Sequence, residues 1–250
     1  MTPVGHFMCA SAVAGNVGLT SEKETWCCFA YYVLFLVVFL ILSLILVPGK
    51  WGMYIHDWFG NVALIFFLFF WGRAADERKR CFVSLLIGTQ ILSGFTHIFD
   101  VLAFKSLGYV PTGMWRPHNI LHTPLAAIVI PLMALPLVSY LMKGLSYKKA
   151  YFYLSLGYFL HIFADTITYN YQIYPLWPLS SFHVALVDFF QRPDVVSSQF
   201  LGAPLYIFEG STKMNVDGFI VYKSEVLINF LLIALFSIRV FSRRLFRTGL

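Results

Sequence analysis

The sequence predicts an all-α fold, a polytopic membrane helical bundle with about six transmembrane helices. Of its 250 residues, 59% are hydrophobic and 12% are charged, whereas a soluble domain has about 45–50% apolar and about 25% charged residues. The mean hydropathy is +0.73. The apolar residues also gather into stretches close to the length of about 20 residues that crosses a bilayer as a helix.

These stretches define the expected spans, which cover residues 30–47, 58–71, 82–104, 122–142, 150–169 and 225–241. Pro48-Gly49-Lys50 ends the first span, and Pro131 and Pro136 are expected to kink the fourth.

The remaining segments are assigned by composition. Residues 1–25 are small and mildly polar, and we expect them to lie on the surface or to be loosely ordered. Residues 170–224 are rich in Pro, Gly and aromatic residues, and predict a long extracytoplasmic cap with a re-entrant or interfacial helix near 182–190. The expected organisation is therefore an N-terminal cytoplasmic segment, 1–29, followed by a single transmembrane helical domain, 30–250.

Basic residues set the expected orientation, because cytoplasmic loops carry an excess of Lys and Arg. On the predicted topology twelve of them fall on the side of the termini and six on the opposite side. Both termini are thus expected to be cytoplasmic, in an integral protein of the plasma (inner) membrane. The net charge of +6 then reflects topology, so membrane lipid is the expected partner and nucleic acid is not.

The stretch from Gly157 to Ser180 carries the most informative pair of polar residues. His161 and Asp165 are four residues apart, which places them on one face of a helix. An ionised carboxylate in an apolar span costs about 2.5–3.5 kcal/mol, so Asp165 requires pairing, water or a metal. Imidazole nitrogen and carboxylate oxygen are good ligands for zinc-like ions. Simple pairing of Asp165 with His161, or with a neighbouring helix, is the alternative.

Six of the seven histidines, all except His6, fall at the outer level of the predicted bundle. Three helices each bring two candidate ligands to that level: His97 with Asp100, His118 with His122, and His161 with Asp165. Metal sites in helix bundles are assembled from facing helices in this manner. We therefore expect a divalent metal, zinc first, with His97, His122, His161 and Asp165 as candidate ligands.

Each residue outside the 161–165 pair also has a simpler interpretation. His97 and Asp100 can form a local hydrogen bond at a helix end, and His118 can be an interfacial residue. Arg116 can be an anchor whose charged end reaches the headgroups. His56 and His183 can be solvated loop residues.

The run GYFLHIFADTIT followed by YPLWPLS resembles the signature of the YdjM-type membrane-bound metal-dependent hydrolases. That family shows an aspartate-bearing box, then H-R-x-x-T-H-S, then G-x-x-x-H-x-x-x-D and W-P-x-S. The residues that match the last two boxes are Gly157, His161, Asp165, Trp177, Pro178 and Ser180. His122-Thr123 stands where the T-H-S histidine would be, and the resemblance covers about residues 85–185.

The earlier boxes depart from the family pattern. His97-x-x-Asp100 replaces Asp-x-Asp, His118 and His122 are four residues apart instead of five, and Arg116 precedes the histidine. The resemblance implies a metal-dependent hydrolase related to zinc-dependent phospholipases C, acting on a lipid phosphoester or ester. Asp100 and His118 are then the candidate catalytic groups, with Arg116 binding an anionic phosphate.

Three other functions remain open from the sequence. A transporter or channel would use intramembrane His and Asp as a proton or cation path, although the inner halves of the third to fifth spans offer few polar residues. A di-iron site would need glutamates in these helices, and they hold none in the relevant stretches; a bis-His haem is a related option. A non-catalytic assembly or scaffold protein could keep the hydrolase-like fold without the activity.

Overall fold

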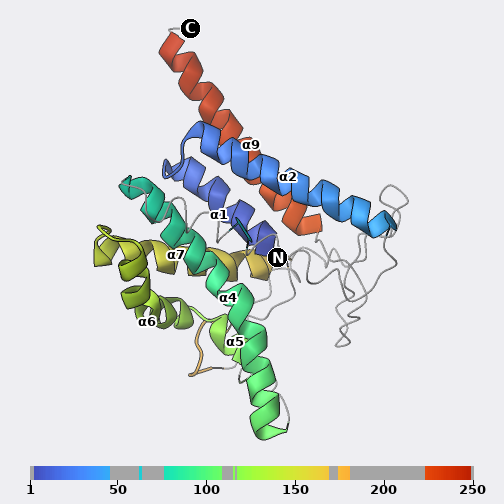
Figure 1. Ribbon diagram of the computed structural model, residues 1–250, viewed down its shortest axis with the longest axis vertical. Helices are drawn as coiled ribbons and strands as arrows, with labels where there is room; N and C mark the ends of the chain where they lie inside the picture. Colours follow the sequence, from blue (N-terminus) through green and yellow to red (C-terminus); the bar gives the residue numbers. More distant parts are fainter. Residues whose placement is uncertain are drawn as a thin grey trace. The chain divides into compact units, whose positions relative to one another are not determined.

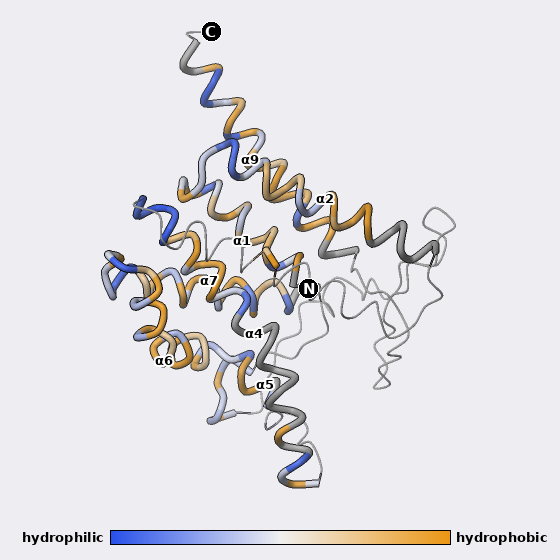
Figure 2. Tube along the Cα trace, viewed as in Figure 1, coloured by the Kyte–Doolittle hydropathy of each residue, from blue (hydrophilic) through white to orange (hydrophobic). Residues whose placement is uncertain are grey.

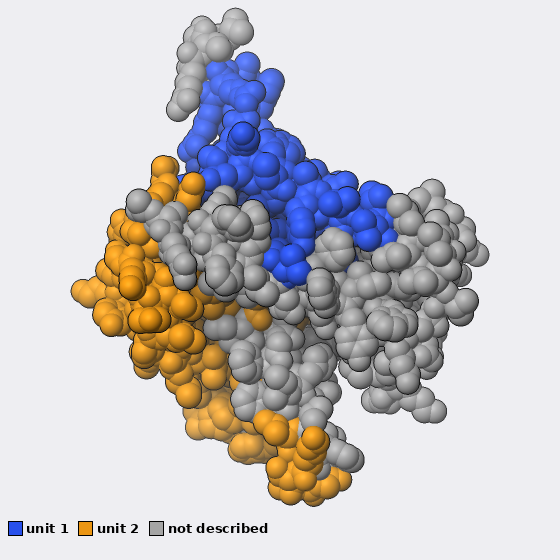
Figure 3. Space-filling view, in the orientation of Figure 1, with its two compact units in different colours: residues 1–63, 193–250 blue, residues 64–192 orange. Residues whose placement is uncertain are grey.

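A computed structural model of the chain describes residues 3–45, 62–63, 76–108, 115, 117–168, 174–180 and 223–248. Every regular element within these ranges is a helix, in agreement with the predicted all-α class (Figure 1). Most of the expected second span and most of the expected cap lie outside the described residues. The chain divides into two compact units, Met1–Ala63 with Pro193–Leu250, and Leu64–Arg192 (Figure 3).

The first unit contains α1 (Pro3–Val17), α2 (Glu22–Ile45) and α9 (Lys223–Thr248). Its core joins Val4, Met8 and Ala12 of α1 to residues of the other two helices, namely Tyr32, Phe35, Ile233 and Phe236. The expectation that residues 1–25 are surface-lying or loosely ordered is therefore wrong for α1. The small residues that gave α1 a mildly polar appearance let its backbone lie close to its neighbours, as at Gly15, where an added Cβ would meet the Thr25 hydroxyl at 2.6 Å.

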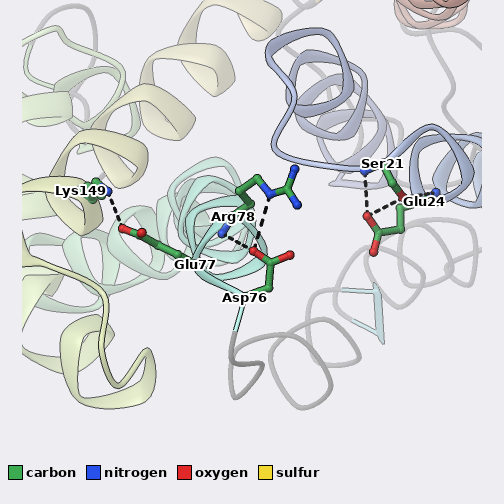
Figure 4. A network of polar contacts seen from close by, with 6 residues as sticks. All are labelled: Ser21, Glu24, Asp76, Glu77, Arg78 and Lys149. Carbon is green, nitrogen blue, oxygen red and sulfur yellow. Dashed lines mark hydrogen bonds and ion pairs between the residues drawn. The ribbon is translucent and has the colours of Figure 1, made fainter.

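A capping box starts α2. The Ser21 hydroxyl accepts a hydrogen bond from the Glu24 peptide N–H at 3.3 Å, and the Ser21 N–H donates to the Glu24 carboxylate at 2.8 Å (Figure 4). These reciprocal bonds satisfy N–H groups that have no partner within the helix.

Substituting Ser21→Ala is expected to lower the free energy of unfolding by about 1 kcal/mol, because the cap acceptor is lost. The measurement is thermal unfolding of the purified protein in detergent. Ser21→Asn, which keeps a capping oxygen, is the control and is expected to stay near the wild type. Ser21→Ala with the stability of the wild type would show that the capping oxygen contributes nothing.

The second unit contains α4 (Glu77–Leu107), α5 (Pro117–Leu121), α6 (Ala126–Leu141) and α7 (Tyr147–Thr168). The third and fifth predicted spans correspond to α4 and α7, and both helices extend beyond the predicted boundaries into polar residues. At their N-terminal ends the Lys149 ammonium contacts the Glu77 carboxylate at 2.5 Å (Figure 4). This hydrogen bond raises the pKa of Lys149.

The helix that corresponds to the predicted fourth span, 122–142, begins later than expected. Residues 117–121 form the short helix α5, and α6 starts at Ala126. The Thr123 hydroxyl donates to the Ile120 carbonyl at 2.8 Å and accepts from the Ala126 N–H at 3.1 Å. Pro124 also disfavours a helical Thr123. The polypeptide therefore turns at His122 rather than continuing as one helix.

Among the described residues, Val226–Leu245 in α9 is the one segment with both the length and the hydropathy to cross a membrane. Helices α1 and α6 contain apolar segments that are shorter than such a span. Most of the α9 segment is not buried within the chain. Figure 2 shows the hydrophobic colouring of α6 and of the middle of α9.

Candidate metal centre

Three buried side chains of the second unit meet at one carboxylate oxygen. Asp165 Oδ2 lies 3.2 Å from His161 Nε2 and 3.2 Å from His122 Nε2. The residues are 4%, 3% and 1% exposed, respectively. The imidazole rings of His122 and His161 have centroids 5.5 Å apart and are tilted by 51°. Two nitrogen atoms and one oxygen atom thus converge in a space closed to solvent.

Helix α7 supplies two of these groups directly. His161 and Asp165 lie one helical turn apart, so both side chains project from the same face. His122 comes from the turn between α5 and α6, where its own peptide N–H donates to the Asn119 carbonyl at 3.1 Å. Its ring reaches α7 because α6 packs on α7 through Ala126, Ala127, Tyr158 and Ile162.

The other nitrogen of His161 is already engaged. Its Nδ1 lies 2.6 Å from the carbonyl oxygen of Thr89 in α4. A carbonyl oxygen can only accept, so Nδ1 carries the proton of this hydrogen bond. In a neutral imidazole the Nε2 atom is then an acceptor, and it lies 3.2 Å from the Asp165 oxygen, which is also an acceptor when ionised. Two acceptors at 3.2 Å need either a shared proton or a cation between them.

Two glycines allow His161 to reach the Thr89 backbone. Helices α4 and α7 cross (Figure 1), and a Cβ added at Gly157 would lie 2.1 Å from the Leu85 carbonyl oxygen. A Cβ added at Gly88 would lie 2.1 Å from the Leu154 carbonyl oxygen. The two backbones are therefore in contact at the crossing, as in close helix pairs of membrane proteins. His161 is one turn beyond Gly157, beside the crossing.

The arrangement has the chemical features of a divalent metal site. Neutral imidazole nitrogen and carboxylate oxygen are zinc ligands, and catalytic zinc is commonly held by three protein groups. Metal-binding histidines usually donate their second N–H to a carbonyl or carboxylate. The bond from His161 to Thr89 is of that kind.

The structure brings together three of the candidate residues, His122, His161 and Asp165. His97 and Asp100 lie within α4, and His118 within α5, but their side chains are outside the described part of the chain. Arg116, His56 and His183 are also outside it. Trp177 and Ser180 of the last box lie in a turn, where the Trp177 ring meets that of Trp115 edge-on.

Thr89 is a partner of the site that the sequence pattern did not indicate, because its contribution is a backbone carbonyl. Gly88 beside it is the one signal that could have pointed there, since a glycine within an apolar helix often marks a close helix contact.

The comparisons with known proteins add no relative to this picture. No protein-family model matches the chain, and no curated protein and no solved structure matches it. The likeness to YdjM-type hydrolases therefore stays a prediction that rests on the residues alone.

Proposed function

We propose that the chain is a polytopic membrane protein whose His122, His161 and Asp165 bind a divalent metal ion, zinc first, for hydrolysis of a lipid phosphoester or ester. The observation that supports this proposal best is the Nε2 atom of His161. It lies 3.2 Å from a carboxylate oxygen of Asp165 while Nδ1 donates to Thr89. A cation at this position satisfies both acceptors at once.

Exposed apolar side chains support the membrane part of the proposal. On α9 they form a stripe that includes Leu227, Leu231, Leu235, Ile238 and Phe241. On α6 they include Ile128, Leu132, Met133, Leu137 and Tyr140. Contiguous apolar surface of this kind is rare on soluble monomers, and lipid is the environment in which it carries no cost. The distribution of basic residues supports cytoplasmic termini, and the proposal places the protein in the plasma (inner) membrane.

The chemistry divides between the ion and the protein. A bound divalent ion would polarise a phosphoryl or carbonyl oxygen and lower the pKa of a water to about 7. His122, His161 and Asp165 hold the ion, and the Thr89 carbonyl fixes the tautomer of His161. Within the proposal, Arg116 binds the anionic phosphate, and Asp100 or His118 accepts the proton of the attacking water. All three are assigned from the sequence.

Replacing His161 by alanine tests the metal site. The full-length protein in detergent, stripped with chelator and reloaded with Zn²⁺, is expected to retain about one ion per chain, because three protein groups commonly hold a catalytic zinc. His161→Ala is expected to retain almost none and to lose hydrolysis of a fluorescent phospholipid. Ser155→Ala is the control, because this residue lies on the same helix and its Oγ has no hydrogen-bond partner in the described chain.

Unchanged zinc content in His161→Ala would refute the metal site. Full zinc loading of the wild type without hydrolysis of any phospholipid or lipid ester would refute the catalytic part only.

The burial of the three side chains favours a second candidate function. In a non-catalytic protein, transporter-like or a scaffold, a protonated His161 and an ionised Asp165 form a buried ion pair, and His122 donates to the same carboxylate. This alternative expects no bound metal in the wild type, so the zinc measurement separates the two.

A further inference from the structure

Tyr158 links α7, which carries His161 and Asp165, to the turn between α5 and α6, which carries His122. It lies on α7, three residues before His161, and its side chain is fully buried. Its hydroxyl donates a hydrogen bond to the Leu121 carbonyl at 3.0 Å. Its ring packs against Ala126, Ala127 and Ile162. The ring thus contributes to the α6–α7 contact, and the hydroxyl has a separate partner on α5.

The accepting carbonyl belongs to the peptide that leads into His122. Leu121 is the last residue of α5, and the carbonyls of a final helical turn lack donors within their helix. The peptide plane from Leu121 to His122 is therefore oriented by whatever donates to that carbonyl. Tyr158 is such a donor, so its hydroxyl acts on the backbone from which the His122 ring projects.

Helix α7 consequently contributes to the position of all three candidate ligands. It carries His161 and Asp165 and reaches the third through Tyr158. We propose that Tyr158 is a positioning residue, whose hydroxyl orients His122 toward Asp165 through the Leu121 carbonyl. This inference rests on the proposed metal site. Groups that orient metal ligands in this way typically change metal affinity by about 10–100-fold when they are removed.

The same helix offers a matched control. Two turns earlier the Tyr151 hydroxyl donates to the Ile128 carbonyl at 3.3 Å. This is also a tyrosine-to-backbone bond that leaves α7, but its acceptor lies inside α6, beyond the turn that holds His122. Removing it eliminates a bond of the same chemical kind without touching the peptide before His122.

The experiment compares Tyr158→Phe and Tyr151→Phe in the full-length protein, with wild type and His161→Ala beside them. Co²⁺ serves as the probe, because its visible absorption reports coordination geometry. Three quantities are measured: the Co²⁺ dissociation constant, the shape of the visible spectrum and the melting temperature of the metal-free protein. Phenylalanine keeps the ring and its packing, so both variants are expected to fold.

We expect Tyr158→Phe to weaken Co²⁺ binding by about 10–100-fold and to alter the spectrum. Tyr151→Phe is expected to match the wild type in both, and the two metal-free variants are expected to melt at similar temperatures. Equal Co²⁺ affinity and spectrum in the two variants would overturn the positioning role. A metal-free melting temperature far lower for Tyr158→Phe than for Tyr151→Phe would also overturn it, because the hydroxyl would then act on the fold in general.

Failure of the metal site itself has a different signature. Wild-type protein that binds no Co²⁺ saturably, or His161→Ala that binds as tightly as wild type, would overturn the proposed function and this inference together. Tight wild-type binding that is lost in His161→Ala and unchanged in Tyr158→Phe would overturn the inference alone.

Discussion

Replacing Asp165 by asparagine is expected to abolish zinc binding and hydrolytic activity while leaving the protein folded. Asp165 Oδ2 is the atom that both imidazoles share, at 3.2 Å from each Nε2. Asparagine keeps the size of the side chain but removes the negative charge that balances the cation, and a neutral amide is a poor zinc ligand. We expect the zinc affinity to fall by about 100-fold or more, since the loss of an orienting group alone costs about 10–100-fold.

The fold can survive this change because the new side chain offers His161 a hydrogen-bond donor in place of the carboxylate. The side-chain amide N–H of the introduced asparagine can donate to Nε2, while Nδ1 still donates to the Thr89 carbonyl. The measurement is the melting temperature with zinc and with chelator. Zinc should raise it in the wild type, because a ligand that binds the folded state stabilises that state, and should have no effect in Asp165→Asn.

The opposite pattern supports a buried ion pair. In that pattern zinc does not change the melting temperature of the wild type, and the free energy of unfolding of Asp165→Asn is about 3–5 kcal/mol below that of the wild type. Such a loss indicates that the substitution has broken a buried ion pair. The metal site is then refuted.

Replacing Gly157 by alanine is expected to separate α4 from α7 and to disturb the cluster. The added methyl carbon would lie 2.1 Å from the Leu85 carbonyl oxygen and 2.9 Å from the Thr89 backbone nitrogen. Both are backbone atoms, so neither can rotate away. Overpacking costs about 1–3 kcal/mol, and occasionally more. Because the clash is beside Thr89, we also expect the bond from His161 Nδ1 to weaken and the zinc affinity to fall.

Gly144→Ala is the control for that substitution. Gly144 has a φ of +87° and its nearest neighbour is the Arg80 side chain at 3.5 Å. Alanine there costs about 1–2 kcal/mol for the left-handed backbone and leaves the helix crossing intact. Thermal unfolding and zinc affinity are measured for both variants. Gly157→Ala with the zinc affinity of Gly144→Ala would contradict the role of the crossing.

The sequence predicted the parts of the fold that depend on long apolar stretches. Two of the predicted stretches, 82–104 and 150–169, are helices, namely α4, Glu77–Leu107, and α7, Tyr147–Thr168; that these helices cross a membrane stays a prediction. The ends were misplaced because Glu77 and Lys149 pair with each other and let both helices begin in polar sequence. Helix α1 was missed, because its 15 residues are too few for a span and its small side chains resemble those of a surface segment.

The sequence could predict the side-chain members of the cluster but not its backbone partners. The four-residue spacing of His161 and Asp165 fixes their common face, and the topology places His122 at the same level. The Thr89 carbonyl and the Leu121 carbonyl have no signature in the sequence, because every residue has a carbonyl and only the tertiary structure selects which one is used.

The backbone contact at Gly88 and Gly157 also limits how the second unit can move. Two rods that touch at one point can change their angle only about that point, and displacement grows with distance from it. With a rise of about 1.5 Å per residue, His161 lies about 6 Å from Gly157 along α7, whereas Tyr147 at the far end lies about 15 Å away. A change in angle of about 10° would move His161 by about 1 Å and Tyr147 by about 2.6 Å. The imidazole therefore lies near the point of contact, where a change in helix angle displaces it least.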